Sequence, residues 1–277
     1  MESNQKDKRV YELEGKITLI TGAATGIGLA IARKYVEEKA SVALVDFNVE
    51  KMNLAVEELY ELDPDAKLLA VPCDITKEAD VINAVKVIVE HFGRLDVAVN
   101  NAGVAVSVPS EQCTLEQWNW TMAVNCTGSF LVSREAIKVF MEQGDGGALV
   151  YMNSDDALKP SRHFLAYNSS KAATLHMART IANEFGKHKI RANSILPGAV
   201  FGGSELWTKE MREARANLHG FDSDLLEEDY KKHNALGVVI DPTEIAELAV
   251  FLASDRSAKM TGAALVIDGG GAGGFVR

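Results

Sequence analysis

Short apolar runs alternate with longer amphipathic segments along almost the whole chain. Residues 42–45 are apolar at every position, as is typical of parallel strands that are covered on both faces. Over residues 165–187, in contrast, apolar side chains recur at helical spacing and leave one polar face. The pattern predicts strands over 16–21, 41–46, 67–71, 95–100, 148–153, 190–196 and 263–267. It predicts helices over 26–40, 49–62, 77–92, 114–142, 165–187 and 242–253.

Strands and helices that alternate in this way form βαβ units with right-handed crossovers. We therefore predict an α/β fold, a single-domain Rossmann-like, doubly wound parallel sheet of seven strands with helices on both faces. Residues 1–14 are expected to form a polar N-terminal extension, and residues 15–277 the folded domain. The charged stretch 202–239 interrupts the alternation and is interpreted as a helical lid rather than a second domain.

Composition and charge exclude several classes of protein. Lys and Arg number 29 against 39 Asp and Glu, a net charge of −10 that disfavours nucleic acid as a partner. No run of about 18 apolar residues occurs, and the first residues lack the apolar region of a signal peptide, so neither a membrane span nor a leader is expected. Cys73, Cys113 and Cys126 lack metal-ligand spacing, as do the 6 histidines. We expect no metal and a reducing, cytoplasmic location.

A glycine-rich turn follows the first predicted strand and opens a helix. It reads Thr21-Gly22-Ala23-Ala24-Thr25-Gly26-Ile27-Gly28. Glycines let the backbone approach a pyrophosphate closely, and the start of a helix offers unpaired N–H groups to it. An ordinary tight turn is the alternative for such a cluster taken alone. Its position at the first βα junction favours a dinucleotide-binding site, which makes 15–277 a dinucleotide-binding catalytic domain.

Asp46, at the end of the second predicted strand, indicates which dinucleotide is bound. A carboxylate there can accept hydrogen bonds from both hydroxyls of the adenosine ribose and repels a 2′-phosphate. Thr25 in the turn and Phe47 and Asn48 after the carboxylate leave no Lys or Arg for that phosphate. The sequence therefore favours NAD over NADP, a solvated turn aspartate being the alternative. Asp74, after the third strand, is a candidate for the adenine amino group, although Asp is common after strands.

Tyr167 and Lys171 are four positions apart on a predicted helix and so share one face. A phenol, with a pKa of about 10, is a poor base at neutral pH unless a nearby positive charge favours the phenolate. Such a pair alone is more often chance spacing on a surface. Here Asn125, Ser154 and the motif Pro197-Gly198 also lie at or near the carboxyl edge of the predicted sheet, where ligands bind in this architecture.

Taken in order, these motifs resemble those of the short-chain dehydrogenase/reductase family over nearly all of residues 13–270. The matching motifs are Thr21-Gly22-x-x-x-Gly26-x-Gly28, Asn100-Asn101-Ala102-Gly103, Asn125, Ser154, Tyr167-x-x-x-Lys171, Pro197-Gly198 and Asp268-Gly269-Gly270. The resemblance implies that the cofactor contacts Gly22, Thr25, Gly26, Ile27, Gly28, Asp46, Phe47, Asp74, Ile75, Asn101, Ala102, Gly103, Tyr167, Lys171, Pro197, Gly198 and Val200.

The resemblance also implies four catalytic roles. Tyr167 exchanges a proton with the substrate oxygen as general acid and base, and Ser154 hydrogen-bonds that oxygen. Lys171 lowers the pKa of Tyr167 and holds the nicotinamide ribose. Asn125 anchors a water that connects Lys171 to solvent; a polar residue that bends the helix is the alternative reading.

Two departures from the family pattern bear on the pocket. Gly202 occupies the position where the family often has a Thr that holds the nicotinamide carboxamide, and Ser204 is a candidate substitute. Asp155 and Asp156 follow Ser154, where small residues are usual, and because buried carboxylates need partners they indicate a polar pocket. The substrate is expected to contact Ser154, Asp156, His163 and Trp207. Arg212, Arg215 and Lys232 are candidates for binding an anionic substrate.

The resemblance implies an NAD(H)-dependent oxidoreductase that acts on CH–OH donors, with a sugar, sugar phosphate or polyol as its substrate. The lid and the tail look like a subgroup that includes the sorbitol-6-phosphate dehydrogenase type and the dehydrogenase half of bifunctional rhamnulose-phosphate aldolases. The alternatives are an NADP-dependent ketoreductase and a non-catalytic nucleotide-binding protein. Family resemblance also implies a homotetramer or homodimer built through the two longest helices.

Overall fold

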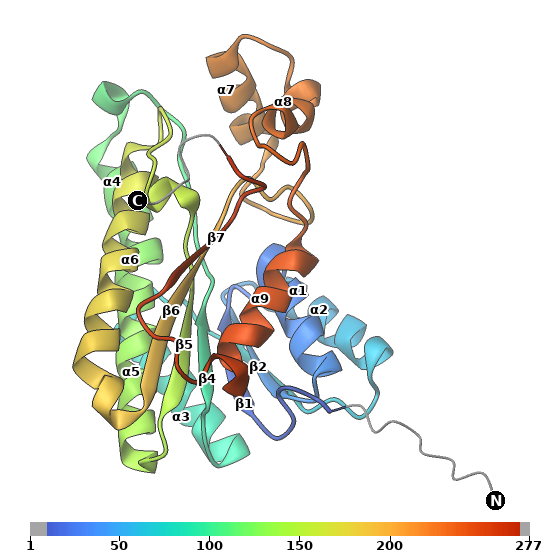
Figure 1. The fold of residues 1–277 in the computed structure, drawn as a ribbon, viewed down its shortest axis with the longest axis vertical. Helices are drawn as coiled ribbons and strands as arrows, with labels where there is room; N and C mark the ends of the chain where they lie inside the picture. The colour runs from blue at the N-terminus through green and yellow to red at the C-terminus, as the bar shows by residue number, and fades with distance from the viewer. Residues whose placement is uncertain (1–9, 272–277) are drawn as a thin grey trace, which may run out of the picture.

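Seven parallel strands form one sheet in the computed structural model, which describes residues 10–271 (Figure 1). The strands are β1 (Ile17–Thr21), β2 (Ser41–Asp46), β3 (Leu68–Pro72), β4 (Val97–Asn100), β5 (Gly147–Met152), β6 (Ile190–Pro197) and β7 (Ala264–Ile267). Their order is β3-β2-β1-β4-β5-β6-β7, so the direction of strand addition reverses between β1 and β4. Ile20 of β1 accordingly pairs with Leu44 on one side and Val99 on the other. The predicted fold class is confirmed.

Helices cover both faces of this sheet because its strands are apolar on both sides. The helices are α1 (Gly26–Glu37), α2 (Val49–Leu62), α3 (Glu78–Phe92), α4 (Leu115–Met122), α5 (Ser129–Gln143), α6 (Leu165–Phe185), α7 (Lys209–His219), α8 (Leu226–Lys232) and α9 (Pro242–Ala253). Leu44 of β2 packs into the core shared with α1, α2 and α9, whereas its neighbour Val45 packs into the core on the side of α3, α5 and α6. Alternate residues of each strand thus build two separate apolar layers.

The folded body begins before residue 15. Leu13, which the sequence assigns to the N-terminal extension, is fully buried in the core shared with α1. Residues 1–9 of that extension and residues 272–277 of the tail lie outside the described residues.

Helices α7 and α8 belong to the stretch predicted as a lid, and they lie above the carboxyl ends of the strands (Figure 1). Within this predicted lid, Ala216 and Leu226 share a small apolar cluster with Phe201.

The helix predicted over 114–142 is present, but it is not α-helical throughout. Between α4 and α5 the residues Ala123–Gly128 form a π-helical segment. The backbone carbonyl of Asn125 accepts hydrogen bonds from the hydroxyls of Ser129 (2.8 Å) and Thr174 (3.3 Å). Because a π-turn weakens the regular ladder of backbone bonds, side-chain donors replace backbone donors here.

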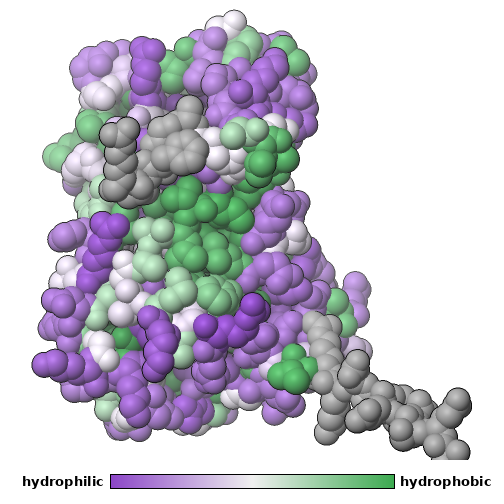
Figure 2. All heavy atoms as spheres, in the orientation of Figure 1, coloured by the Kyte–Doolittle hydropathy of each residue, from purple (hydrophilic) through white to green (hydrophobic). Residues whose placement is uncertain are grey.

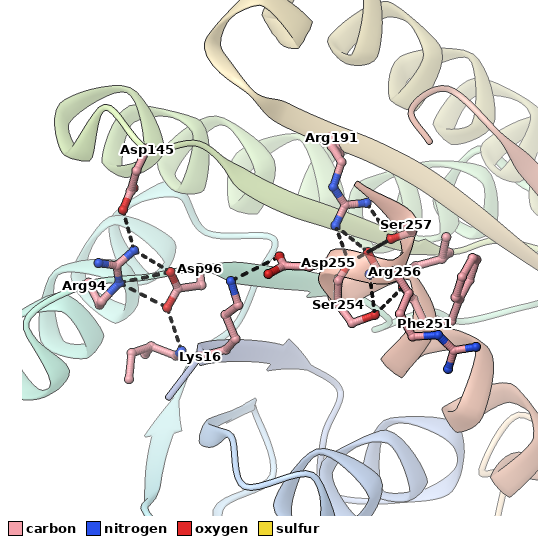
Figure 3. A network of polar contacts seen from close by, with 12 residues as sticks. Lys16, Arg94, Asp96, Asp145, Arg191, Phe251, Ser254, Asp255, Arg256 and Ser257 are labelled. Carbon is pink, nitrogen blue, oxygen red and sulfur yellow. Dashed lines mark hydrogen bonds and ion pairs between the residues drawn. The ribbon is translucent and has the colours of Figure 1, made fainter. Parts of the chain in front are cut away.

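A network of ion pairs and hydrogen bonds lies where the strands begin, at the amino ends of the strands (Figure 3). Asp96, just before β4, accepts a hydrogen bond from the backbone N–H of Ile17 at 2.8 Å and binds Arg94 at 2.6 Å. Arg94 also pairs with Asp145, just before β5, at 2.9 Å. Arg191 of β6 donates to the backbone oxygen of Leu252 at the end of α9. These contacts fix the strand starts in register, at the edge remote from the candidate site.

Figure 2 shows apolar side chains gathered on the face where β7 and α9 lie. Strand β7 is at the edge of the sheet, and its residues Ala264–Ile267 are all only partly buried. Leu248 and Phe251 of α9 are also partly buried against the neighbouring core. None of the helices within residues 10–271 is both long enough and apolar enough to span a bilayer.

Candidate active site

Two cavities open at the carboxyl edge of the sheet and meet at Tyr167. The turn cavity, of about 520 Å³, runs from Asp46 past the glycine-rich turn to Lys171. The lid cavity, of about 510 Å³, lies between Ser154 and the lid. Both volumes fall in the range of small-molecule sites. Five residues line both cavities: Ile27, Asn153, Tyr167, Ser204 and Leu206.

The glycines of the turn are required by its close approach to the loop after β4. Gly22 has a φ of +63°, and a Cβ on it would lie 2.9 Å from the Cα of Ala102. A Cβ on Gly28 would overlap the carbonyl oxygen of Gly22 and lie 2.6 Å from Nδ2 of Asn101. That amide donates to the backbone oxygens of Thr21 (2.9 Å) and Gly22 (3.1 Å). Gly28 is thus packed behind the turn and does not line the cavity. The predicted residues that line it here are Gly22, Thr25, Gly26, Ile27, Asn101, Ala102 and Gly103.

Asp46 presents a buried carboxylate to the turn cavity. Its side chain is held by the backbone N–H groups of Ala24 (3.2 Å) and Asn48 (2.9 Å), and the residue is only 9% exposed. One bond to each oxygen leaves further lone pairs for two ribose hydroxyls. The sequence argument from Thr25, Phe47 and Asn48 did not include one basic residue, Lys51 in the first turn of α2, which also lines this cavity. Its ammonium is paired with Glu205 of the lid.

Asp74 lines the turn cavity as predicted, but its carboxylate is already engaged. It accepts hydrogen bonds from the backbone N–H (3.0 Å) and hydroxyl (2.6 Å) of Thr76 and pairs with Lys77 at 3.2 Å. The hydrogen bond from the Thr76 hydroxyl is the main reason that the pKa of Asp74 lies below its usual value. Ile75 lines the same cavity and packs so closely against Gly128 that a Cβ there would lie 2.6 Å from its Cδ1.

Lys171 comes to the end of the turn cavity from α6 and is buried. Its ammonium donates to the backbone oxygen of Met152 at 2.9 Å and lies 5.5 Å from the ring centre of Tyr167. Burial lowers the pKa of Lys171 to about 8, and the carboxylate of Asp156 opposes that shift. A Cβ on Gly103 would lie 3.5 Å from this ammonium, so the glycine leaves room for a ligand beside it.

Asn125 is buried in the π-helical segment, next to the loop after β4. Its Nδ2 donates to the backbone oxygen of Val104 (2.8 Å) and to the hydroxyl of Ser170 (2.9 Å), and its Oδ1 accepts from the Val104 N–H at 2.8 Å. The side chain therefore ties three elements together around Lys171. Its implied role as the anchor of a proton-relaying water stays a prediction.

Tyr167 is buried where the two cavities meet, and its environment differs from the expected one. Burial raises the pKa of the phenol above its usual value, the carboxylates of Asp156 and Asp155 raise it further, and a hydrogen bond with Ser154 lowers it. In the protein without its cofactor the net shift is therefore upward, and the lowering by Lys171 that is expected beside an oxidised nicotinamide stays a prediction. The ammonium of Lys171 is directed to a backbone oxygen, and burial makes it a weaker cation, so the desolvation of the phenol prevails.

Two carboxylates stand beside Ser154 in the wall of the lid cavity. The Ser154 hydroxyl accepts a hydrogen bond from the backbone N–H of Asp156 (3.1 Å) and donates to Asp155 (3.3 Å). Asp155 pairs with Lys159 at 3.0 Å. Burial, followed by the charge of Asp156, raises the pKa of Asp155 to about 6. Burial also raises the pKa of Asp156, whose carboxylate accepts from the backbone N–H of Ser161 at 3.0 Å. The sequence-based expectation of a polar pocket agrees with this wall.

The lid supplies aromatic and basic side chains to the other wall of its cavity. Trp207 donates through Nε1 to the backbone oxygen of Val200 (2.8 Å) and stacks on Phe201 with ring centres 4.4 Å apart. Arg215, almost fully buried, donates to the hydroxyl of Tyr230 at 3.1 Å and lies over the ring of Phe164. The lid cavity is therefore lined partly by aromatic and partly by charged groups.

Several predicted contacts lie elsewhere. His163, a candidate for the substrate, lines neither cavity; it holds a φ of +65°, and its backbone oxygen accepts from Val108. Arg212 pairs with Glu227 at 3.0 Å outside the lining, and Lys232 is also outside it. The predicted cofactor residues Pro197, Gly198 and Val200 line the lid cavity and not the turn cavity. Phe47 lines the turn cavity but is 77% exposed.

The residues of the turn cavity fit a dinucleotide. A buried carboxylate lies at one end, the N-terminus of α1 with its glycine turn lies in the middle, and Lys171 and Tyr167 lie at the other end. A Thr would be crowded at position 202, because a Cβ on Gly202 would lie 3.1 Å from Pro242 Cδ. Ser204, which lines both cavities, is the better placed hydroxyl at this end. Among residues 10–271, no group of three side chains is arranged to hold a metal ion.

Known proteins resemble this chain over nearly its full length. A family model described as enoyl-(acyl carrier protein) reductase matches residues 22–271. The "uncharacterized oxidoreductase YuxG" of Bacillus subtilis is 41% identical over 96% of this chain, which spans only 39% of the length of that protein. D-threitol dehydrogenase of Mycolicibacterium smegmatis is 38% identical, and the match covers 94% of each chain.

Solved structures agree with these matches. A short-chain type dehydrogenase/reductase from Mycobacterium marinum superimposes with a TM-score of 0.82 at 30% identity, covering 94% of this chain and 96% of the other. A 3-ketoacyl-(acyl-carrier-protein) reductase from Brucella melitensis, solved in complex with NADH, superimposes with a TM-score of 0.81 at 30% identity, covering 93% and 98%. Sequence and fold therefore agree that the chain belongs to the short-chain dehydrogenase/reductase family of oxidoreductases, which use a nicotinamide cofactor.

Proposed function

We propose that this protein is an NAD(H)-dependent dehydrogenase that interconverts a secondary alcohol and a ketone on a neutral polyol or sugar. The observation that carries the proposal is the convergence of Ser154, Tyr167 and Lys171 where two ligand-sized cavities meet. One cavity has the shape and groups for a dinucleotide, and the other is polar and separate from it. A reaction between a dinucleotide and a second molecule requires such a shared wall.

Tyr167 would act as the general base in alcohol oxidation and as the general acid in ketone reduction. A bound nicotinamide would supply the hydride-accepting carbon and, when oxidised, a positive charge beside the tyrosine. Ser154 would orient the substrate oxygen through its hydroxyl. Lys171, with a pKa near 8, is able to take up or release a proton close to neutral pH, and so to pass it between Tyr167 and the Asn125 region.

Asp46 supports NAD as the preferred cofactor. The 2′-phosphate of NADP would face the buried carboxylate of Asp46, which already accepts hydrogen bonds from two backbone N–H groups. Lys51 is the group that would favour NADP, and its pairing with Glu205 supports the preference for NAD by neutralising it. These two carboxylates and one ammonium leave the adenosine end of the turn cavity net negative, which disfavours a 2′-phosphate.

The charges of the lid cavity support a neutral substrate over a sugar phosphate. Asp155 and Asp156 line it near Ser154, and Asp268 lines it near Lys159. Arg215 is the arginine of the lid in the lining, where His219 and His233 also lie, and it already donates to Tyr230 and to a backbone oxygen. A polyhydroxylated ligand offers donors to the carboxylates and acceptors to the cations, whereas a phosphate would be repelled by the larger number of carboxylates. The similarity to a threitol dehydrogenase supports the same class.

A spectrophotometric screen tests this function. Polyols, sugars, their phosphates and simple secondary alcohols are offered with NAD and, in parallel, with NADP, and reduction is followed at the NADH absorbance. We expect oxidation of neutral polyols with NAD. Comparable rates with NADP would contradict the argument from Asp46, and faster turnover of sugar phosphates would contradict the argument from the lid cavity. If NADH binds but no alcohol is oxidised and no ketone is reduced, the protein is a non-catalytic nucleotide-binding protein.

We also propose that the protein assembles as a homotetramer or homodimer. Leu115 and Trp120 of α4 and Phe130 and Met141 of α5 are exposed apolar side chains on neighbouring helices. Apolar residues also gather over β7 and α9 (Figure 2). Exposed apolar surfaces of this kind support self-association. Light scattering coupled to gel filtration distinguishes a monomer from either assembly.

A further inference from the structure

Asn153 is a buried side chain with one unused hydrogen-bond donor at the junction of the two cavities. It follows β5 directly, is 4% exposed, and lines both the turn cavity and the lid cavity. Its backbone N–H continues the sheet ladder by donating to Ile195 at 2.8 Å. Its Oδ1 accepts from the backbone N–H of Ser154 at 3.2 Å. Within the described part of the chain, its Nδ2 has no hydrogen-bond partner.

The orientation of this amide is fixed by its neighbour. If the amide turned over, its NH₂ group would face the N–H of Ser154, and two donors would meet. The donor must therefore remain on the other side, where it is without a protein partner. Since buried donors are almost always paired, an unpaired one in the wall of a cavity indicates that a ligand supplies the acceptor.

The reacting oxygen does not need this donor. A carbonyl oxygen accepts two hydrogen bonds, which Tyr167 and Ser154 supply in the proposed function once the Ser154 hydroxyl turns from Asp155 to the substrate. A third donor placed one residue from Ser154 is available for the next oxygen of the substrate. That oxygen would be the hydroxyl on the carbon adjacent to the one that is oxidised.

We propose that Asn153 is a specificity-determining residue that binds the hydroxyl next to the reacting carbon. The enzyme would thereby prefer vicinal diols, and in the reverse direction α-hydroxy ketones, over isolated alcohols and ketones. This inference rests on the proposed function. It extends that function by naming the part of the substrate that is recognised and the amide that binds it.

The test compares two substrates that differ by one hydroxyl, butane-2,3-diol and butan-2-ol, with NAD. The quantity measured is the ratio of kcat/KM for the diol to kcat/KM for the mono-alcohol, in the wild type, Asn153→Ala and Asn153→Asp. Asn153→Asp keeps an acceptor for Ser154 but loses the donor, so it carries the test where Asn153→Ala does not fold. Asn100→Ala is the matched control, because Asn100 is equally buried and has an unpaired oxygen but lines neither cavity.

We expect the diol to be preferred by the wild type and the ratio to fall about 10-fold in both Asn153 variants, the usual effect of one lost hydrogen bond. The ratio should stay at the wild-type value in Asn100→Ala, and NADH binding, followed by fluorescence, should be unchanged in the Asn153 variants. An equal fall for both substrates, or a change confined to the KM for NAD, would overturn the proposal for Asn153 and leave the dehydrogenase function standing. A wild type that binds NADH but oxidises neither alcohol, nor any polyol, would remove the proposed function itself.

Discussion

Replacing Asp155 by Asn should stabilise the protein at neutral pH. The carboxyl is enclosed in the wall of the lid cavity, its side chain is 15% exposed, and its pKa is raised from 3.8 to about 6. This difference corresponds to about 3 kcal/mol of free energy, which the folded protein loses when Asp155 ionises. Water at the cavity mouth and the ion pair with Lys159 reduce the gain on substitution, so we expect about 2 kcal/mol. For a chain of this size, that raises Tm by about 3–4 °C.

The pH dependence of this effect follows from the direction of the shift. Because the folded pKa is raised, the unfolded chain loses the proton at a lower pH than the folded protein does. The stability that protonated Asp155 contributes is therefore fully present below about pH 4 and is lost as the pH rises to about 6. Asp155→Asn should accordingly raise Tm strongly at pH 8 and hardly at pH 4.

Differential scanning fluorimetry over pH 4–9 measures both quantities. Asp145→Asn serves as the control, because Asp145 is an exposed carboxyl whose pKa is lowered by Arg94, and its removal should give no stabilisation. The same variant has an activity readout. Since the charge of Asp155 raises the pKa of Tyr167, its loss should move the acid limb of the oxidation rate to lower pH. A Tm gain that is equal at pH 4 and pH 8, or a loss at pH 8, would refute the reasoning.

Three further predictions concern the proposed cofactor and the tyrosine proposed as general acid and base. Tyr167→Phe should reduce turnover by at least about 100-fold and leave NADH affinity unchanged; normal turnover would remove the phenol from the mechanism. Gly28→Ala should abolish NADH binding and lower Tm, because its Cβ would overlap the carbonyl oxygen of Gly22; a titration that matches the wild type would show that the turn can yield. Asp46→Ala combined with Phe47→Arg should shift kcat/KM toward NADP, and an unchanged NAD preference would show that Asp46 does not set it.

Much of the fold, and the convergence of the proposed catalytic residues, was predictable because both depend on local sequence patterns. The apolar run of β2 and the helical spacing of α6 are each contained in one segment, so their structures follow from their own residues. Tyr167 and Lys171 share a face of one helix. The placement of Ser154 required only the rule that the carboxyl ends of parallel strands meet at one edge.

The features that the sequence did not reveal depend on contacts between distant segments. The distance of Lys51 in sequence from Asp46 does not indicate that this lysine lines the turn cavity, where it pairs with Glu205 of the lid. The pKa of Tyr167 depends on burial and on Asp156, neither of which a four-residue spacing reveals. Asn153 gave no signal in the sequence, since an Asn before Ser154 looks like any other polar residue after a strand. Its unused donor is apparent only when all its neighbours are known.

The irregular turn at Ala123–Gly128 has a consequence for how this helix tolerates change in length. A π-turn holds one residue more than the α-helical register accommodates. Deleting a single residue there would let α4 and α5 merge into one regular helix, and the ladder of backbone bonds would gain by it. Because the wide turn already absorbs the additional residue, the same deletion would leave α4 and α5 facing as they do now and would move the residues inside the turn relative to their neighbours. Asn125 could then no longer reach both Val104 and Ser170. The shorter helix would have more regular backbone hydrogen bonds, but it would no longer hold the surroundings of Lys171 in place.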